Sequence, residues 1–98
     1  MENKFLLPFI KIHILYHASK SKIYGHWMKQ ELERHGYSIS YGTLYPTLHK
    51  LLSEEYLTCE KEIIQGKVRK YYSITEKGKI LLDILRDKVK ELVDEIME

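Results

Sequence analysis

The stretch ISYGTLYPTLHK, residues 39–50, begins with residues that are common in loops and ends with residues at helical spacing. Its leucines fall at helical spacing and continue past the segment at Leu44, Leu48, Leu51 and Leu52. That spacing predicts the buried face of an amphipathic helix over residues 41–55. The start of this helix carries hydroxyl and aromatic side chains but no charge, whereas the exposed face of a surface helix is normally charged.

Two residues fit the position that caps this helix. If Ser40 is the N-cap, Pro46 lies in the second turn and removes one backbone hydrogen bond. If Thr43 is the N-cap, Pro46 stands at the third helical position, where its missing N–H has little effect. The sequence does not choose between the two.

The other elements follow from the same kinds of pattern. Helices are predicted over residues 4–18, 24–35 and 75–97, and strands over Leu57–Ile64 and Arg69–Ile74 with a turn at residues 65–67. The order H-H-H-E-E-H is mainly α with a small β-hairpin (α+β), and it predicts a winged helix-turn-helix followed by a long C-terminal helix. Residues 1–74 are assigned to the winged domain and residues 75–98 to the terminal helix.

Composition sets the bounds of this interpretation. The chain has 98 residues, 44% of them hydrophobic and 31% charged, and a net charge of +2. It can therefore form one modest core, and its overall charge does not by itself indicate nucleic acid. The single cysteine, Cys59, excludes an internal disulfide, and no apolar run is long enough to span a membrane. These features favour a cytoplasmic protein.

The surface of the third helix suits a groove in DNA. Opposite the leucines lie Gly42, Thr43, Pro46, His49 and Lys50, with Tyr41, Tyr45 and Thr47 at the borders. In a winged helix this element enters the major groove, where small residues allow close approach and hydroxyl groups bond to bases or phosphates. A purely structural helix start would also contain Ser, Thr, Gly and Pro, and that alternative stays open.

The hairpin tip carries three cations, Lys67, Arg69 and Lys70. A wing of this kind can neutralise phosphates beside the groove, although a solvated charged turn would look the same. At this separation the tip and the third helix together favour DNA binding. The DNA contacts are predicted at Ser40, Tyr41, Gly42, Thr43, Tyr45, Pro46, Thr47, His49, Lys50, Lys67, Arg69, Lys70 and Tyr71.

Both terminal helices need a partner surface. The first helix is apolar over most of its circumference, and the last carries apolar residues at spacings typical of a helix-packing seam. A final helix that folds back on its own domain, or pairs with a different protein, is the alternative. The predicted dimer interface comprises Phe5, Phe9, Leu81, Leu85, Val89, Leu92, Val93 and Ile96.

Three stretches point to a family: Tyr24-Gly25, ISYGTLYP at residues 39–46 and RKYYSITEKG at residues 69–78. On these motifs, residues 5–90 resemble the PadR family of transcription regulators, in its short subtype with one C-terminal helix. The resemblance implies a non-enzymatic homodimer that represses transcription from a palindromic operator in double-stranded DNA. Two departures are Tyr41, where proline is common, and His26-Trp27, where Tyr-Glu is frequent. The first could alter base readout and the second could repack the helix.

Two histidines and the tryptophan are further candidates for contacts with a metal or a small molecule. His13 and His17 have a helical spacing that can hold zinc or nickel, but no third ligand follows at a recognisable spacing. They are interpreted as interface histidines that could make association pH-sensitive. No metal or cofactor is predicted. Trp27 is interpreted as core; the alternative is an aromatic dimer cavity for a small-molecule effector, as in some relatives.

No motif indicates catalysis, because the sequence has no nucleophile motif, phosphate loop or telling carboxylate pair. The main alternative function is a winged-helix adaptor that binds proteins and not DNA.

Overall fold

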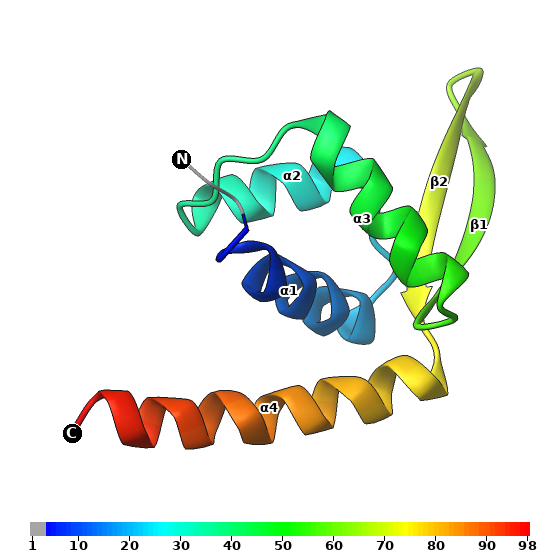
Figure 1. Ribbon diagram of the computed structural model, residues 1–98. Helices are drawn as coiled ribbons and strands as arrows, with labels where there is room; N and C mark the ends of the chain where they lie inside the picture. The colour runs from blue at the N-terminus through cyan, green and yellow to red at the C-terminus, as the bar shows by residue number, and fades with distance from the viewer. Residues whose placement is uncertain (1–3) are drawn as a thin grey trace.

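The computed structural model describes residues 4–98 (Figure 1). Its elements are α1 (Leu7–Lys20), α2 (Gly25–Arg34), α3 (Tyr41–Ser53), β1 (Leu57–Ile64), β2 (Lys67–Ile74) and α4 (Glu76–Ile96). The predicted order H-H-H-E-E-H and the winged-helix class are confirmed. Residues 1–3 of the predicted winged domain lie outside the described residues. The first helix starts later than the predicted residue 4, with Pro8 in its first turn, and it ends at Lys20, two residues after the predicted end.

The end of α2 is fixed by a glycine turn. Gly36 has a φ of +89°, which a residue with a side chain rarely adopts. The Tyr37 N–H donates to the Leu32 carbonyl at 2.9 Å and the Gly36 N–H to the Glu33 carbonyl at 3.0 Å. This is the Schellman arrangement, which ends α2 just before Gly36.

The structure shows that Ser40, and not Thr43, is the N-cap of α3. Ser40 is extended and precedes the first helical residue, and its carbonyl accepts the Leu44 N–H at 2.9 Å. Pro46 therefore lies inside the helix. The helix tolerates it because the buried face on the other side, Leu44, Leu48 and Leu51, holds α3 in the core.

The hairpin is longer than predicted. Gln65 and Gly66 have φ values of +52° and +79°, as a two-residue type I′ turn requires, and Ile64 pairs with Lys67. The turn thus needs two residues only, and β2 begins two positions before the predicted Arg69. Tyr72 faces the core, as the strand alternation predicts.

A short backbone bridge attaches the hairpin to the helices. The Ile23 N–H donates to the Tyr72 carbonyl at 2.9 Å, and the Tyr72 N–H donates to the Ile23 carbonyl at 2.7 Å. Ile23 lies between α1 and α2, so this pair ties the root of the wing to the segment that leads into the helix-turn-helix.

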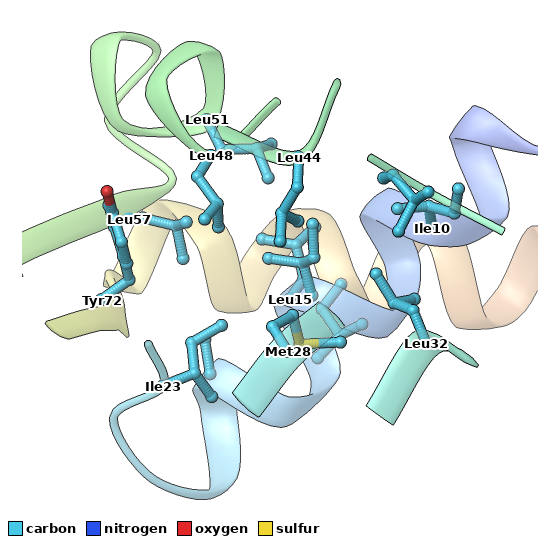
Figure 2. Packing of buried hydrophobic residues seen from close by; sticks show 14 residues of the cluster. Ile10, Leu15, Ile23, Met28, Leu32, Leu44, Leu48, Leu51, Leu57 and Tyr72 are labelled. Atoms are coloured by element: carbon cyan, nitrogen blue, oxygen red, sulfur yellow. The ribbon is translucent and has the colours of Figure 1, made fainter. Parts of the chain in front are cut away.

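One cluster of buried side chains joins all six elements except the outer parts of the wing and α4. Figure 2 shows Leu15 of α1, Met28 of α2 and Leu44 of α3 converging, with Leu57 and Tyr72 of the hairpin beside them. Leu82 brings the first half of α4 into the same cluster.

Trp27 is not part of this core, and that prediction was wrong. Its side chain is 37% exposed, and its ring meets His17 edge to face with centroids 5.3 Å apart. The buried positions of α2 are Gly25, Met28 and Leu32. Trp27 lies one position off that face, at the border with α1.

The last helix is capped at its start and extends past the domain. The Thr75 Oγ accepts the Gly78 N–H at 2.9 Å and donates to the Glu55 carbonyl at 2.6 Å. In Figure 1, α4 runs along α1 and continues beyond it to the C-terminus. Within residues 4–98, no helix combines the length and the apolar character that crossing a membrane requires.

Gly78 allows α4 to approach the end of α3, and we expect Gly78→Ala to destabilise the protein. A Cβ there would lie 2.3 Å from the Tyr56 carbonyl oxygen, which is backbone and cannot rotate away. The free energy of unfolding should fall by roughly 1–3 kcal/mol in urea titrations. Gly42→Ala is the matched control, because its Cβ would meet only the Ser40 Oγ, at 3.5 Å. Equal stability of the two variants would contradict this account of the α4 junction.

Candidate nucleic-acid interface

The start of α3 presents the predicted surface to solvent. Ser40, Tyr41, Gly42, Tyr45, Pro46, His49 and Lys50 are exposed, and Thr43 is half-buried. No acidic residue lies in the first turn, and the Ser40 side chain caps no backbone N–H. The Thr43 N–H donates to the Ser40 carbonyl at 3.1 Å, so the N–H groups of Tyr41 and Gly42 are the ones open toward an anion.

Thr47 does not belong to this surface, which corrects its predicted placement at the border. It is only 6% exposed, and its Oγ donates to the Thr43 carbonyl at 2.7 Å. Thr47 faces the core because it lies one turn after Thr43 and next to the buried Leu48. Its hydroxyl is satisfied within the helix and is not available to a ligand.

A polar and aromatic cluster joins the starts of α2 and α3. The Tyr41 hydroxyl is hydrogen-bonded to His26 Nδ1 at 2.7 Å, and Lys29 Nζ lies 5.4 Å from the centre of the Tyr41 ring. The Tyr41 and Tyr45 rings are stacked, with centroids 5.6 Å apart. Sequence reasoning noted Tyr41 and His26 as separate departures from a family pattern, but the structure shows that they touch. Lys29 was missed, because only the packing of α2 on α3 brings it here.

Gly25 determines how closely α2 approaches Tyr45. A Cβ at Gly25 would lie 2.4 Å from the Tyr45 hydroxyl oxygen, so any larger residue would displace that ring. Tyr24-Gly25 was noted in the sequence as the opening of the second helix, and this contact gives its physical reason.

A groove of about 750 Å³ separates these helix starts from the wing. Its lining comes from Tyr24, Gly25 and His26 on one side, Tyr45 below, and the hairpin residues 64, 65 and 67–70 on the other. Tyr72 uses its N–H and C=O to pair with Ile23. Because alternate residues of a strand direct these groups to the same side, the N–H groups of Lys70 and Val68 point toward the groove.

The wing cations divide into two kinds. Lys67 and Lys70 are exposed, and within residues 4–98 neither they nor Lys50 takes part in a salt bridge. Lys70 lies directly across the hairpin from Lys61, an arrangement of like charges that costs stability unless an anion neutralises it.

Arg69 is held against the protein. Its guanidinium lies 4.1 Å from the centre of the Tyr24 ring, and it donates a hydrogen bond of 3.3 Å to the Tyr71 hydroxyl. That hydrogen bond raises the pKa of Arg69, so the charge persists at any physiological pH. Lys22 lies over the ring of Tyr71, with its Nζ 4.5 Å from the ring centre. Arg69 thus lines the groove, and its contacts with Tyr24 and Tyr71 leave it less free than the two lysines.

The predicted dimer residues lie at or near an open apolar surface. Phe5 is 83% exposed, Phe9, Leu92, Val93 and Ile96 are exposed, and Leu81, Leu85 and Val89 are half-buried. A groove of about 320 Å³ runs between α1 and α4, lined by Phe9, Ile12, His13, Tyr16, Leu82, Arg86 and Val89. Phe9, Ile12 and Tyr16 of α1 therefore face this groove, while Ile10, Ile14, Leu15 and Ala18 face the core.

Comparison with known proteins identifies the family to which these features point. The model of the transcriptional regulator PadR-like family matches residues 14–84, which include the helix-turn-helix, the wing and the first part of α4. The chain is 41% identical over 88 residues to the transcriptional regulator Rv3488 of Mycobacterium tuberculosis, covering 90% of this chain and 82% of the relative.

Solved structures give the same result. A PadR-like transcription factor from Bacteroides fragilis superposes with a TM-score of 0.83 at 30% identity, covering 96% of this chain and 92% of the other. The PadR-like transcriptional regulator BC4206 of Bacillus cereus superposes with a TM-score of 0.82 at 28% identity, covering 97% of each chain.

Proposed function

The chain belongs to the PadR-like family of transcriptional regulators, a class that is not enzymatic, and we propose that it acts as a homodimeric repressor of a palindromic operator. The observation that carries the proposal is the continuous surface formed by the start of α3, the start of α2 and the wing cations. Members of this family bind DNA. This surface is where the present chain offers the chemistry to do so.

The proposed docking places α3 in the major groove. Gly42 is open to solvent and meets no other part of the chain closely, so the backbone can approach the bases there. Ser40, Thr43 and Tyr45 supply hydroxyl groups, and Tyr41 is oriented by His26. Pro46, His49 and Lys50 continue the same face further along the helix. Thr47 is left out because its hydroxyl is bonded inside the helix.

A DNA backbone then fits the groove between the helix starts and the wing. The uncapped start of α2, the N–H groups of β2 and the two exposed lysines all face a strand of phosphates placed there. Arg69 lines that groove and is held there by its hydrogen bond to Tyr71. In this arrangement the wing orients the protein on the DNA and provides most of the binding affinity, while α3 determines the preference for one DNA sequence over another.

Dimerisation through α1 and α4 is proposed from the uncovered apolar surface. The second half of α4 exposes Leu92, Val93 and Ile96 beyond the reach of its own domain. The groove between α1 and α4 continues that surface. A second copy related by two-fold symmetry would cover both, with residues 75–98 as the dimerisation helix and residues 1–74 as the DNA-binding unit. Half-sites about one helical turn apart, roughly 34 Å, follow from this symmetry.

Removing the wing lysines should weaken binding to every DNA sequence. If the dimer contacts about six phosphates, the logarithm of the association constant should fall with the logarithm of salt concentration at a slope near −5. Lys67→Ala with Lys70→Ala removes up to four of these contacts, so the slope should approach about −2. The measurement is fluorescence anisotropy with labelled operator and random duplexes. Lys79→Ala with Lys90→Ala on α4 removes the same charge elsewhere and should leave the slope unchanged. A flat salt response of the wild type would favour the protein–protein adaptor instead.

Gly42→Ala should separate folding from DNA binding. Alanine favours a helix over glycine and meets no obstacle here, so the free energy of unfolding should stay level or rise by up to ~1 kcal/mol. The added methyl group would lie on the face that enters the groove, and operator affinity should fall at least about tenfold. Calorimetry and anisotropy on the same sample measure both. Unchanged operator affinity would show that this face of α3 does not contact the floor of the DNA groove.

A charge on the exposed part of α4 should break the dimer. Leu92→Glu should shift the mass in light scattering toward the monomer and raise the dimer dissociation constant at least tenfold, because a buried unpaired carboxylate is costly. Lys90→Glu places the same side chain on the opposite side of the helix and should leave a dimer. A wild-type chain that is already monomeric at micromolar concentration would refute the proposal.

A further inference from the structure

Three histidines from two helices converge at the junction of α1 and α2. His13 and His17 lie one turn apart on α1, and His35 caps the C-terminal end of α2. One ring nitrogen of each histidine lies within 4.8 Å of the corresponding nitrogen of the other two. The sequence showed only the first pair, because His35 is brought in by the fold.

The backbone holds this third histidine in place. The His35 N–H is bonded to the Glu31 and Leu32 carbonyls, and the glycine turn follows directly. The His13 and His35 rings have centroids 4.7 Å apart, and the His13 and His17 rings are nearly parallel at 6.3 Å. Position and orientation of the set are thus determined by two packed helices, as a binding site requires.

A carboxylate completes the group. Glu31 Oε2 lies 3.0 Å from His35 Nε2 and 3.4 Å from His17 Nε2. Arg34 also binds this carboxylate, with Nη2 at 2.7 Å from Oε2, and its hydrogen bonds are the main reason that the pKa of Glu31 is lowered to about 2. Glu31 is therefore ionised near neutral pH. The Arg34 side chain is exposed and can withdraw into solvent.

We propose that His13, His17, His35 and Glu31 form a four-ligand site for a late first-row divalent ion such as Zn²⁺ or Ni²⁺. Imidazole nitrogen with one carboxylate suits these ions and not Mg²⁺ or Ca²⁺. Tetrahedral coordination with bonds of about 2.0–2.1 Å sets ligand atoms roughly 3.3 Å apart. The histidine ligand atoms lie within 4.8 Å of one another, so binding one ion requires them to approach by up to roughly 1.5 Å, while the Glu31 carboxylate already lies at 3.0 Å from His35 and 3.4 Å from His17.

The surroundings favour the neutral imidazoles that a metal needs. Burial lowers the pKa of His13 and also that of His17, so both carry a free lone pair near neutral pH. Trp27 and Tyr37 meet His17 and His13 edge to face at 5.3 Å and close the flanks of the site. His35 lies at the surface and leaves a route for the ion. An ion here would link α2 of the helix-turn-helix to α1, on which His13 also lines the groove toward α4.

The test is titration of untagged, EDTA-treated full-length protein with Zn²⁺ by calorimetry, and with Co²⁺ by visible absorption. We expect one ion per chain, an intense d–d band typical of a four-coordinate site, and a higher thermal midpoint with Zn²⁺ but not with Mg²⁺. His35→Gln and His17→Gln should each weaken Zn²⁺ binding more than ~100-fold, and Glu31→Gln at least ~10-fold.

The controls separate this site from adventitious binding. His49→Gln removes an imidazole outside the cluster and should leave Zn²⁺ affinity within about twofold of wild type. Circular dichroism shows whether each variant is folded, and His35 is the most informative position because its side chain is at the surface. Equal Zn²⁺ affinity in wild type and His35→Gln, or a weak octahedral Co²⁺ spectrum in the wild type, would overturn the proposal.

Discussion

Two backbone hydrogen bonds between Ile23 and Tyr72 hold the wing against the helices, and the geometry of the whole recognition surface depends on them. They lock the root of β2 beside the segment that enters α2, and the buried Tyr72 ring keeps that root in the core. From this point the hairpin projects outward, with Arg69 directed onto Tyr24. The Ile23–Tyr72 pair joins the two walls of the groove at its root, and the contact of Arg69 with Tyr24 joins them again further out.

The surface built on this frame separates two tasks by chemistry. The wing carries long cations that suit an anionic backbone of any sequence, and the start of α3 carries short hydroxyl and aromatic groups that suit base edges. Low charge at the start of α3 is therefore compatible with the proposed function, because phosphates are neutralised elsewhere. The modest net charge of +2 conceals this local arrangement, since acidic residues on α4 and β1 offset the cations of the wing.

Local patterns predicted the elements well, and tertiary contacts account for what they missed. The leucine spacing of α3 acts over a few residues, as do the glycine turn after α2 and the threonine cap of α4, and it predicted the buried face of α3 correctly. Trp27 and Thr47 were misplaced because each lies within one residue of the boundary between a buried and an exposed face, where periodicity decides poorly. The contact between His26 and Tyr41, and the approach of His35 to His13, join residues far apart in the chain and leave no spacing to find.

The uncovered half of α4 also has a consequence for how the regulator responds to its own abundance. If two chains must associate before either can hold an operator firmly, occupancy at low expression grows with the square of the number of chains in the cell. Modest changes in synthesis or degradation would then produce larger changes in transcription. In such a dimer, the length of α4 beyond its own domain would give the gene circuit a threshold, set by the area of apolar surface that each copy leaves uncovered.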